Sequence, residues 1–330
     1  MGSFTRRDAT RLIAGAGAAL GGGLAAPAVW GQSGITKLRV GLVPVLDAGG
    51  FFMAQVQGHF ARERLEIEVT PTPGGGPSIA ALVAGQFQFS MSTVTTMISA
   101  AAEGVDIRLV TAVSGARPAP EDYSGILVRK DSGIRTGKDV VGKTGASHLL
   151  QNLPWICARL WIDNTGGDSS RARIIEVQFP QQQDALLGNR VDYVATNEPF
   201  MSAALHAAPD RLEVVSGLLG TMLPNTIVAA FAASGDYINK NRAVVDSFVG
   251  AYAQGAAWAQ NNKSSPELVE QLARFTRIAP ERLRAMIAWP DYPRVIDPAN
   301  LERIAQAMKR YGSLPTVPDM GKLIHTTARA

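Results

Sequence analysis

Hydrophobic and polar residues alternate with two different periods from residue 36 onward. Residues 38–43 are apolar at every second position and then continuously, which predicts a strand that enters a covered sheet. Residues 65–69 (LEIEV) alternate strictly and predict a second strand, and residues 51–60 between them predict a helix. Because strands and helices continue to alternate with short links, we expect an α/β fold with mostly parallel sheets and right-handed crossovers.

The other expected elements form two successive sets of strands and helices, which are consistent with two similar lobes. Further strands are expected at 87–91, 108–113, 125–129, 173–177, 191–195, 212–215 and 226–231. Further helices are expected at 77–84, 93–103, 149–163 and 181–187. After residue 240 the pattern is helical only, with helix starts at Ser265-Pro266 and Asp297-Pro298.

The first thirty residues have the three parts of an export signal: a basic start, an apolar middle at 12–29 and a small-residue exit. The paired Arg6 and Arg7 resemble a twin-arginine signal, although Ala9 and Thr10 stand where a bulky pair is usual, so general secretion is the alternative. A membrane anchor is disfavoured because the apolar stretch is rich in glycine. We therefore expect a periplasmic protein.

Composition excludes several classes of protein. Of 330 residues, 46% are hydrophobic and 18% charged, so the chain can bury enough surface to fold. The formal net charge of +4 is too small to imply nucleic acid as a partner. A single cysteine, Cys157, excludes an internal disulfide framework and a thiolate metal cage, and the four histidines lack metal-ligand spacing. Hence we expect no metal, no cofactor and no catalytic constellation.

A series of short motifs follows in a fixed order along the chain. The motifs are 40–44 (VGLVP), 51–55 (FFMAQ), 58–60 (GHF), 65–69 (LEIEV), 82–89 (LVAGQFQF), 92–95 (STVT), 128–132 (VRKDS), 139–143 (DVVGK), 185–188 (ALLG), 191–192 (VD) and 197–200 (NEPF). Each motif is weak alone, while their order is fairly specific. Over roughly residues 36–312 this order resembles the substrate-binding proteins of ABC importers for sulfonates, taurine, nitrate and thiamine-precursor pyrimidines, the NMT1/THI5-like group.

This resemblance implies a two-lobe periplasmic-binding-protein-like fold of type II, with the ligand in a cleft between the lobes. Lobe one would comprise 36–126 and 225–330, and lobe two 127–224. Hinge closure around a small polar organic molecule would present the protein to an ABC permease and its ATPase. A monomer without enzymatic activity is implied. The alternatives are an enzyme of the pyrimidine-precursor type on the same fold, or a ligand sensor.

Ligand-binding residues are expected beyond the carboxyl ends of the strands and at helix N-termini, where free N–H groups are available. The candidates are Asp47, Phe51, Gly75, Ser78, Ser92, Thr93, Ser147, His148, Asn197 and Glu198. Ser92 and Thr93 would meet an anion, unless they only cap the helix. Asp47 would accept a hydrogen bond from a ligand amine or ring N–H, unless it is a solvated loop acid.

The other candidates carry structural alternatives too. His148 would donate to an anion or lie on the surface, and Glu198 is favoured slightly as a structural hydrogen-bond partner at the hinge. Phe51 would stack on a flat ligand, although core packing is the more common role. A zwitterion or a small aromatic acid would suit these residues. No Lys or Arg stands inside the four segments 44–50, 74–78, 92–93 and 146–148, which disfavours a highly charged anion.

Two local features need separate interpretation. Residues 137–144 (GKDVVGKT) match a phosphate-binding loop letter for letter, but the preceding strand is too distant, so a structural turn is favoured. Arg64 stands where the resembling family often has glycine, which suggests a changed turn or local strain. Cys157 lies in an apolar helical stretch and is interpreted as buried packing.

Overall fold

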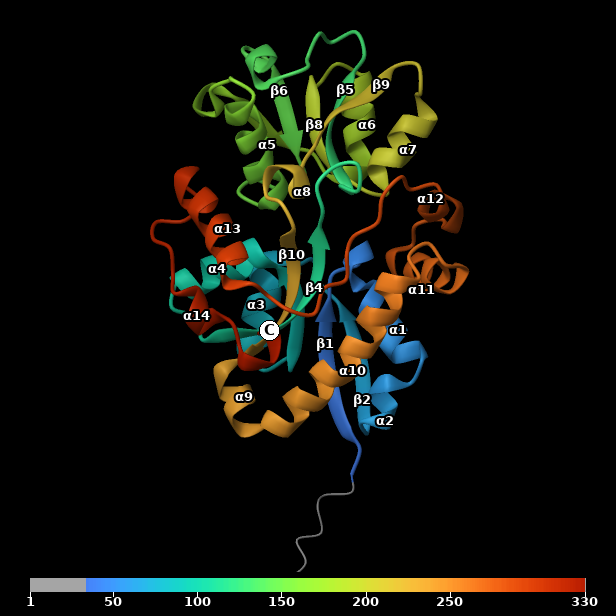
Figure 1. The fold of residues 1–330 in the computed structure, drawn as a ribbon, viewed down its shortest axis with the longest axis vertical. Coiled ribbons are helices and arrows are strands. Elements are labelled where there is room, and N and C mark those ends of the chain that lie inside the picture. The colour runs from blue at the N-terminus through green and yellow to red at the C-terminus, as the bar shows by residue number, and fades with distance from the viewer. Residues whose placement is uncertain (1–33, 330) are drawn as a thin grey trace, which may run out of the picture. The chain divides into compact units, whose positions relative to one another are not determined.

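The computed structural model describes residues 34–329, and the predicted export signal lies outside them. The chain forms two five-stranded sheets flanked by helices (Figure 1). The strands of the first sheet, in sheet order, are β2 (Leu65–Pro71), β1 (Thr36–Leu42), β3 (Phe89–Thr93), β10 (Thr226–Ser234) and β4 (Ile107–Ala116). Those of the second are β7 (Arg173–Glu176), β6 (Thr144–Ser147), β8 (Tyr193–Asn197), β5 (Ser124–Arg129) and β9 (Leu212–Gly217). The expected α/β, two-lobe class is confirmed.

Both sheets share one topology, in which a single strand runs against the others. Strand β10 is antiparallel to its neighbours β3 and β4, and β5 is antiparallel to β8 and β9. The remaining pairs are parallel. Each antiparallel strand is the first strand after the chain has crossed from the other sheet. The expectation of mostly parallel sheets therefore holds, with one inserted strand in each.

Helices cover both faces of the first sheet (Figure 1). The helices over one face, with buried side chains of a common core, are α1 (Gly49–Val56), α2 (His59–Arg62), α10 (Arg242–Asn261), α11 (Pro266–Thr276) and α12 (Pro280–Arg284). Those over the other face are α3 (Gly75–Val83), α4 (Val94–Ala102), α13 (Pro298–Arg310) and α14 (Met320–Leu323). Helix α9 (Gly235–Lys240) follows β10. The core beneath α3, α4, α13 and α14 also contains buried side chains of the second lobe, so the two lobes share one hydrophobic core.

The second sheet is covered by three helices of ordinary length. Helix α5 (Leu153–Asn164) packs in the core that the lobes share, and α6 (Phe179–Leu187) and α7 (Phe200–Ala207) pack over the opposite face. Helix α5 begins four residues later than expected because Asn152 Oδ1 accepts the Trp155 N–H at 3.0 Å. Strand β6 pairs with β8, and its Gly145 faces Tyr193 so closely that a Cβ would lie 2.2 Å from the ring.

Two segments, 117–123 and 218–225, carry the chain between the sheets, and a buried carboxyl joins them. Asp122 Oδ1 accepts from Ser124 Oγ at 2.6 Å, and Oδ2 accepts from the Thr221 N–H at 2.8 Å and Oγ1 at 2.9 Å. The short helix α8 (Leu219–Met222) starts on the second segment, and its Leu219 N–H donates to Ser124 Oγ. The crossing segments are therefore tied side by side.

The phosphate-loop pattern forms a turn. Residues Gly137–Val140 make one 3-10 turn, closed by a capping box between Thr136 and Asp139, and β6 starts at Thr144 where a phosphate-binding loop would need a helix. Cys157 is fully buried, and burial raises its pKa, as expected of a packing residue. Within residues 34–329, helices of the length and apolarity that a bilayer requires are absent.

Arg64 has a left-handed backbone with φ of 56°, at the turn between α2 and β2. Its side chain is exposed and makes no hydrogen bond or ion pair with the described part of the chain. The turn between α2 and β2 therefore has a left-handed residue, a conformation that glycine adopts more easily than arginine.

We expect Arg64→Gly to stabilise the fold. Relief of the left-handed backbone is worth about 1–2 kcal/mol, and the added freedom of glycine in the unfolded chain offsets about 0.5–1 kcal/mol of it. The free energy of unfolding, measured by urea titration, should rise by about 0.5–1 kcal/mol. Arg64→Ala keeps the Cβ and should show no such gain; an equal gain in both variants would contradict the strain.

Candidate ligand-binding cleft

A cavity of about 150 Å³ lies where strand ends of the two sheets meet. It is lined by Val43, Val45, Asp47, Pro73, Gly74, Gly75, Met91, Ser92, Thr93, Thr96, Tyr123, His148, Leu149, Asn152, Leu153, Pro154, Phe179, Asn197, Leu219, Val228 and Ala229. We call it the inner cavity. Its lining comes from the carboxyl ends of β1, β2, β3, β6, β7 and β8, which is where the sequence analysis placed a ligand.

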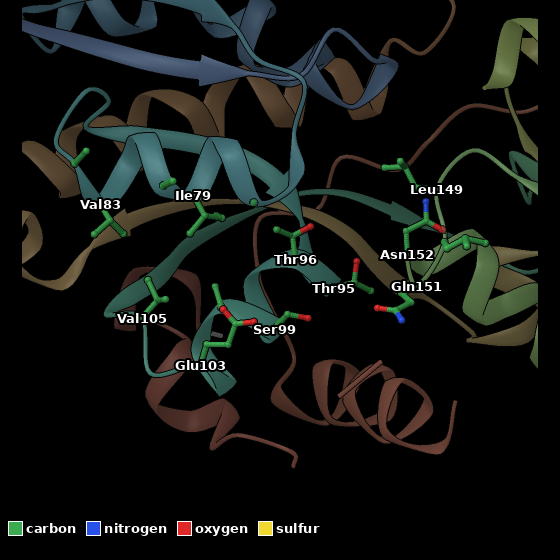
Figure 2. Close-up of a pocket in the computed structure, with 15 residues that line it drawn as sticks. Ile79, Val83, Thr95, Thr96, Ser99, Glu103, Val105, Leu149, Gln151 and Asn152 are labelled. Atoms are coloured by element: carbon green, nitrogen blue, oxygen red, sulfur yellow. The ribbon is translucent and has the colours of Figure 1, made fainter. Parts of the chain in front are cut away.

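Two larger hollows adjoin the inner cavity. The outer cleft, of about 560 Å³, shares Asp47, Tyr123, Phe179 and Asn197 with it and extends to α11 and α12. The α3–α4 groove, of about 680 Å³, shares Thr96, Leu149 and Asn152 with it and runs between helices α3 and α4 (Figure 2). The inner cavity therefore shares lining residues with both of the larger hollows.

Ser92 and Thr93 end strand β3 and precede the N-terminus of α4. Ser92 is buried, and its Oγ has no hydrogen-bond partner among residues 34–329. The Thr93 hydroxyl lies 3.0 Å from Thr96 Oγ1 and, within the described chain, makes no capping bond to the α4 backbone. The alternative of a plain helix cap therefore does not describe Thr93. The first N–H groups of α4 and the Ser92 hydroxyl remain able to bind a ligand.

Asp47 is a buried carboxyl on the wall of the inner cavity. It accepts a hydrogen bond from Ser114 Oγ. Burial raises its pKa, although the Ser114 bond acts in the opposite direction. Tyr123 shares the cavity, and burial together with the nearby Asp47 raises the pKa of its phenol. A neutral carboxyl here can donate one hydrogen bond, and a carboxylate would suit a cationic ligand group.

His148 lines the inner cavity and stacks on Phe179, with ring centroids 4.2 Å apart. Asn152 Nδ2 lies 3.0 Å from a ring nitrogen. Burial lowers the pKa of His148 to about 4, so its imidazole is neutral at neutral pH. It can therefore offer a ligand a hydrogen bond, as considered from the sequence, but without a positive charge.

Asn197 and Glu198 end strand β8 and differ in what they contact. Asn197 lines the inner cavity, and its buried Oδ1 lacks a hydrogen-bond partner in the described structure. The Glu198 carboxylate accepts from Ser202 Oγ at 2.6 Å and from the Ile287 N–H at 3.3 Å. Burial raises its pKa. Glu198 borders the outer cleft, and its bonds join α7 to the C-terminal segment.

The other four candidates lie at different depths. Gly75 lines the inner cavity with a φ of 64° at the start of α3. Ser78 is buried on α3, and Ser147 donates to Asn152 Oδ1 at 3.4 Å beneath the cavity wall. Phe51 is fully buried between Phe60 and Phe231 in the core of the first lobe.

Several lining residues escaped the sequence analysis. Tyr123 lies on a crossing segment, and Phe179 starts α6, so neither belongs to a strand-end motif. Two arginines also line the outer cleft: Arg277 directly follows α11, and Arg282 lies on α12. Both are distant in sequence from the four expected segments. An exposed arginine carries no signal of its own.

The fold and its cavity define a two-lobe protein of the periplasmic-binding class. Residues 46–265 match the model of the family described as NMT1/THI5 like, so the chain belongs to this family. A protein of Brachyspira hyodysenteriae, named provisionally as an ABC transporter periplasmic binding protein, is 22% identical over 255 residues, which are 71% of this chain and 69% of that protein.

Solved structures share the fold. The periplasmic aliphatic sulphonate binding protein SsuA of Escherichia coli superposes with a TM-score of 0.75 at 19% identity, covering 88% of this chain and 98% of its own. The periplasmic nitrate-binding protein NrtA of Synechocystis PCC 6803 gives 0.72 at 14% identity, covering 88% and 86%. At such identity the likeness establishes the fold alone.

We expect Asp47→Asn to raise stability at neutral pH. Because the pKa of Asp47 in the folded protein lies above the ordinary value of an aspartate, the charged form destabilises the fold as pH rises from about 4 toward the folded pKa, and the penalty persists above it. Each unit by which the pKa is raised is worth about 1.4 kcal/mol. Thermal unfolding should show a gain for Asp47→Asn at pH 7 that shrinks near pH 4.

Asp139→Asn is a control for which we expect the opposite change in stability at pH 7. Asp139 accepts N–H groups of Arg135 and Thr136, which lower its pKa. Its ionised form therefore stabilises the fold above pH 4, and the asparagine variant should be less stable than the natural chain at pH 7. A lower melting temperature for Asp47→Asn at pH 7 would contradict the assignment of Asp47.

Proposed function

We propose that this protein is the solute-binding component of an ABC importer and that it carries a small polar organic molecule. One observation carries the proposal: Ser92 and Asn197 line the same inner cavity from different sheets, and Ser92 Oγ and Asn197 Oδ1 are each buried without a hydrogen-bond partner among residues 34–329. A buried polar atom without a partner costs about 1–3 kcal/mol. A ligand that bonds both atoms removes this cost and links the sheets.

The lining supports a ligand with one polar, weakly charged end. Asp47, Tyr123, His148 and Asn197 offer hydrogen bonds, and the N-terminus of α4 favours negative charge. A sulfonate, a carboxylate or a nitrogen heterocycle meets these conditions. Lys and Arg do not occur among the described residues that line the inner cavity, so ligand charge would be balanced by N–H groups, or by Asp47 for a cation.

The lobes are proposed to divide near residues 126 and 225 and to close by bending the tied crossing segments. Closed protein would dock as a monomer on a membrane permease that is driven by an ATPase. Residues 1–30 would direct export to the periplasm, by the twin-arginine route with general secretion as the alternative. The ligand is released unchanged, so the protein is not an enzyme. A ligand sensor would share the same closure.

Replacing Ser92 with alanine is the central test. The variant should be more stable than the natural chain without ligand, because an unsatisfied buried hydroxyl is removed, by about 1 kcal/mol. Its affinity should fall about tenfold for any compound, from a panel of sulfonates, carboxylates and pyrimidines, that raises the melting temperature of the natural protein. Calorimetric titration measures the affinity, and chromatography of the recovered compound shows whether it was consumed.

Ser90→Ala is the matched control. Ser90 lies two residues earlier on β3, is equally buried and also lacks a partner for its Oγ within the described chain, but it does not line the inner cavity. It should gain stability without any change in affinity. Equal affinity of Ser92→Ala and the natural chain would refute the site, and conversion of the compound would favour the enzyme alternative.

Closure should depend on an ion pair between the lobes. Asp163 Oδ2 of α5 accepts from Arg310 at 2.6 Å, at the end of α13, and from the Tyr311 hydroxyl at 2.8 Å. Burial raises the pKa of Asp163, but hydrogen bonds from Ser169 and Tyr311 and the charge of Arg310 outweigh this effect and lower it.

Asp163→Asn should favour the open form and weaken ligand binding about two- to fivefold, as the loss of one partly exposed pair implies. Small-angle scattering should show a larger radius of gyration for the variant without ligand. Glu270→Gln, which breaks the Arg274 pair inside α11, is the control and should change neither quantity. An unchanged radius and affinity in Asp163→Asn would refute a role in closure.

A further inference from the structure

The α3–α4 groove is a second space for a ligand, joined to the inner cavity. One wall is helix α3, with Ile79 and Val83, and the opposite wall is α4, with Thr95, Thr96 and Ser99 (Figure 2). Residues 149–152 of the second lobe stand at the end where the groove meets the inner cavity. Thr96, Leu149 and Asn152 line both spaces, so the groove and the inner cavity lie side by side at these residues.

The groove is mainly apolar and displays large side chains that the protein leaves exposed. Val83 is 52% exposed on α3, and Leu149 and Leu150 are 42% and 43% exposed on the second lobe. Ala80, Ala84 and Ala100 keep the groove open because their side chains are short. Exposed apolar residues gathered from two lobes over one hollow are typical of a site that an apolar group covers.

We infer that the groove holds the apolar chain of the ligand whose polar end occupies the inner cavity. This inference rests on the proposed function and makes it more specific: the ligand is an amphiphile with an unbranched hydrocarbon chain. Helix α4 has nine residues, so the groove beside it is about 13 Å long. This length accommodates a chain of about eight to ten carbons.

The far end of the groove sets a further condition on the ligand. Glu103 lies at the end of α4, beyond Ser99, and Val105 follows it (Figure 2). A second anionic group at the end of the chain would meet this carboxylate. A methyl end or a cationic end meets no such repulsion. The groove should therefore select against a second acidic group at the far end of the chain, whichever polar end occupies the inner cavity.

A series of n-alkyl compounds from two to ten carbons tests the inference. Three polar ends are compared, sulfonate, carboxylate and amine, each at concentrations below micelle formation. For the polar end that binds, affinity should rise about two- to fourfold per methylene until the groove is filled, as expected for buried CH₂ groups. The α,ω-dicarboxylate of ten carbons should bind more weakly than the monocarboxylate of that length.

Two groove variants and one control make the test specific. Ala80→Phe fills the groove and should flatten the rise of affinity with chain length. Val83→Ser, at an exposed position that tolerates a polar side chain, should weaken only the longest members. Ala61→Phe places the same ring on an exposed position of α2 outside the groove and should behave as the natural chain.

The outcomes separate this inference from the function on which it rests. Affinity that is independent of chain length, or equal slopes in Ala80→Phe and the natural chain, overturns the groove assignment and leaves the inner cavity as the binding site. If compounds of all three polar ends fail to bind at every length, both the groove assignment and the amphiphile class are overturned.

Discussion

The cleft depends on one constraint: each sheet is completed by an antiparallel strand that arrives from the other sheet. Strand β10 pairs between β3 and β4, and β5 pairs between β8 and β9. The chain must therefore cross twice, and the Asp122 carboxyl fixes the crossing segments to each other through Ser124 and Thr221. Because the parallel strands of both sheets end toward this crossing, their polar ends gather around a single cavity.

The inner cavity, the α3–α4 groove and the outer cleft would each select a different property of the ligand. The inner cavity is small and polar, and its unsatisfied atoms on β3 and β8 set hydrogen-bond geometry. The α3–α4 groove is mainly apolar, and its extent would limit the length of the ligand's hydrocarbon chain. The outer cleft is lined by Arg277 and Arg282, whereas the described lining of the inner cavity and of the groove contains no Lys or Arg. Since residues of both lobes line all three spaces, closure changes them together.

The sequence predicted the fold more completely than the site, for physical reasons. Period-two runs such as 65–69 report burial directly, and strand ends follow from them, so Asp47, Ser92 and Asn197 were found. Strand β6 gives a weak sequence signal because its four residues, TGAS, are small and show no apolar alternation. Phe51 was among the predicted ligand residues, but its side chain on α1 packs in the core against Phe231. Tyr123 and Phe179 reach the cavity through tertiary packing that no local pattern encodes.

Burial sets the protonation states of Asp47 and His148, and these states decide which ligands the inner cavity can bind. Burial raises the pKa of Asp47 and lowers that of His148 to about 4, so both groups are driven toward their neutral forms. A cavity of neutral groups binds through directed hydrogen bonds, and it repels neither sign strongly. An anionic head would be held by the N–H groups of α4, with Asp47 protonated beside it. A cationic head would require Asp47 to lose its proton on binding, so that the pH dependence of affinity distinguishes the two kinds of ligand.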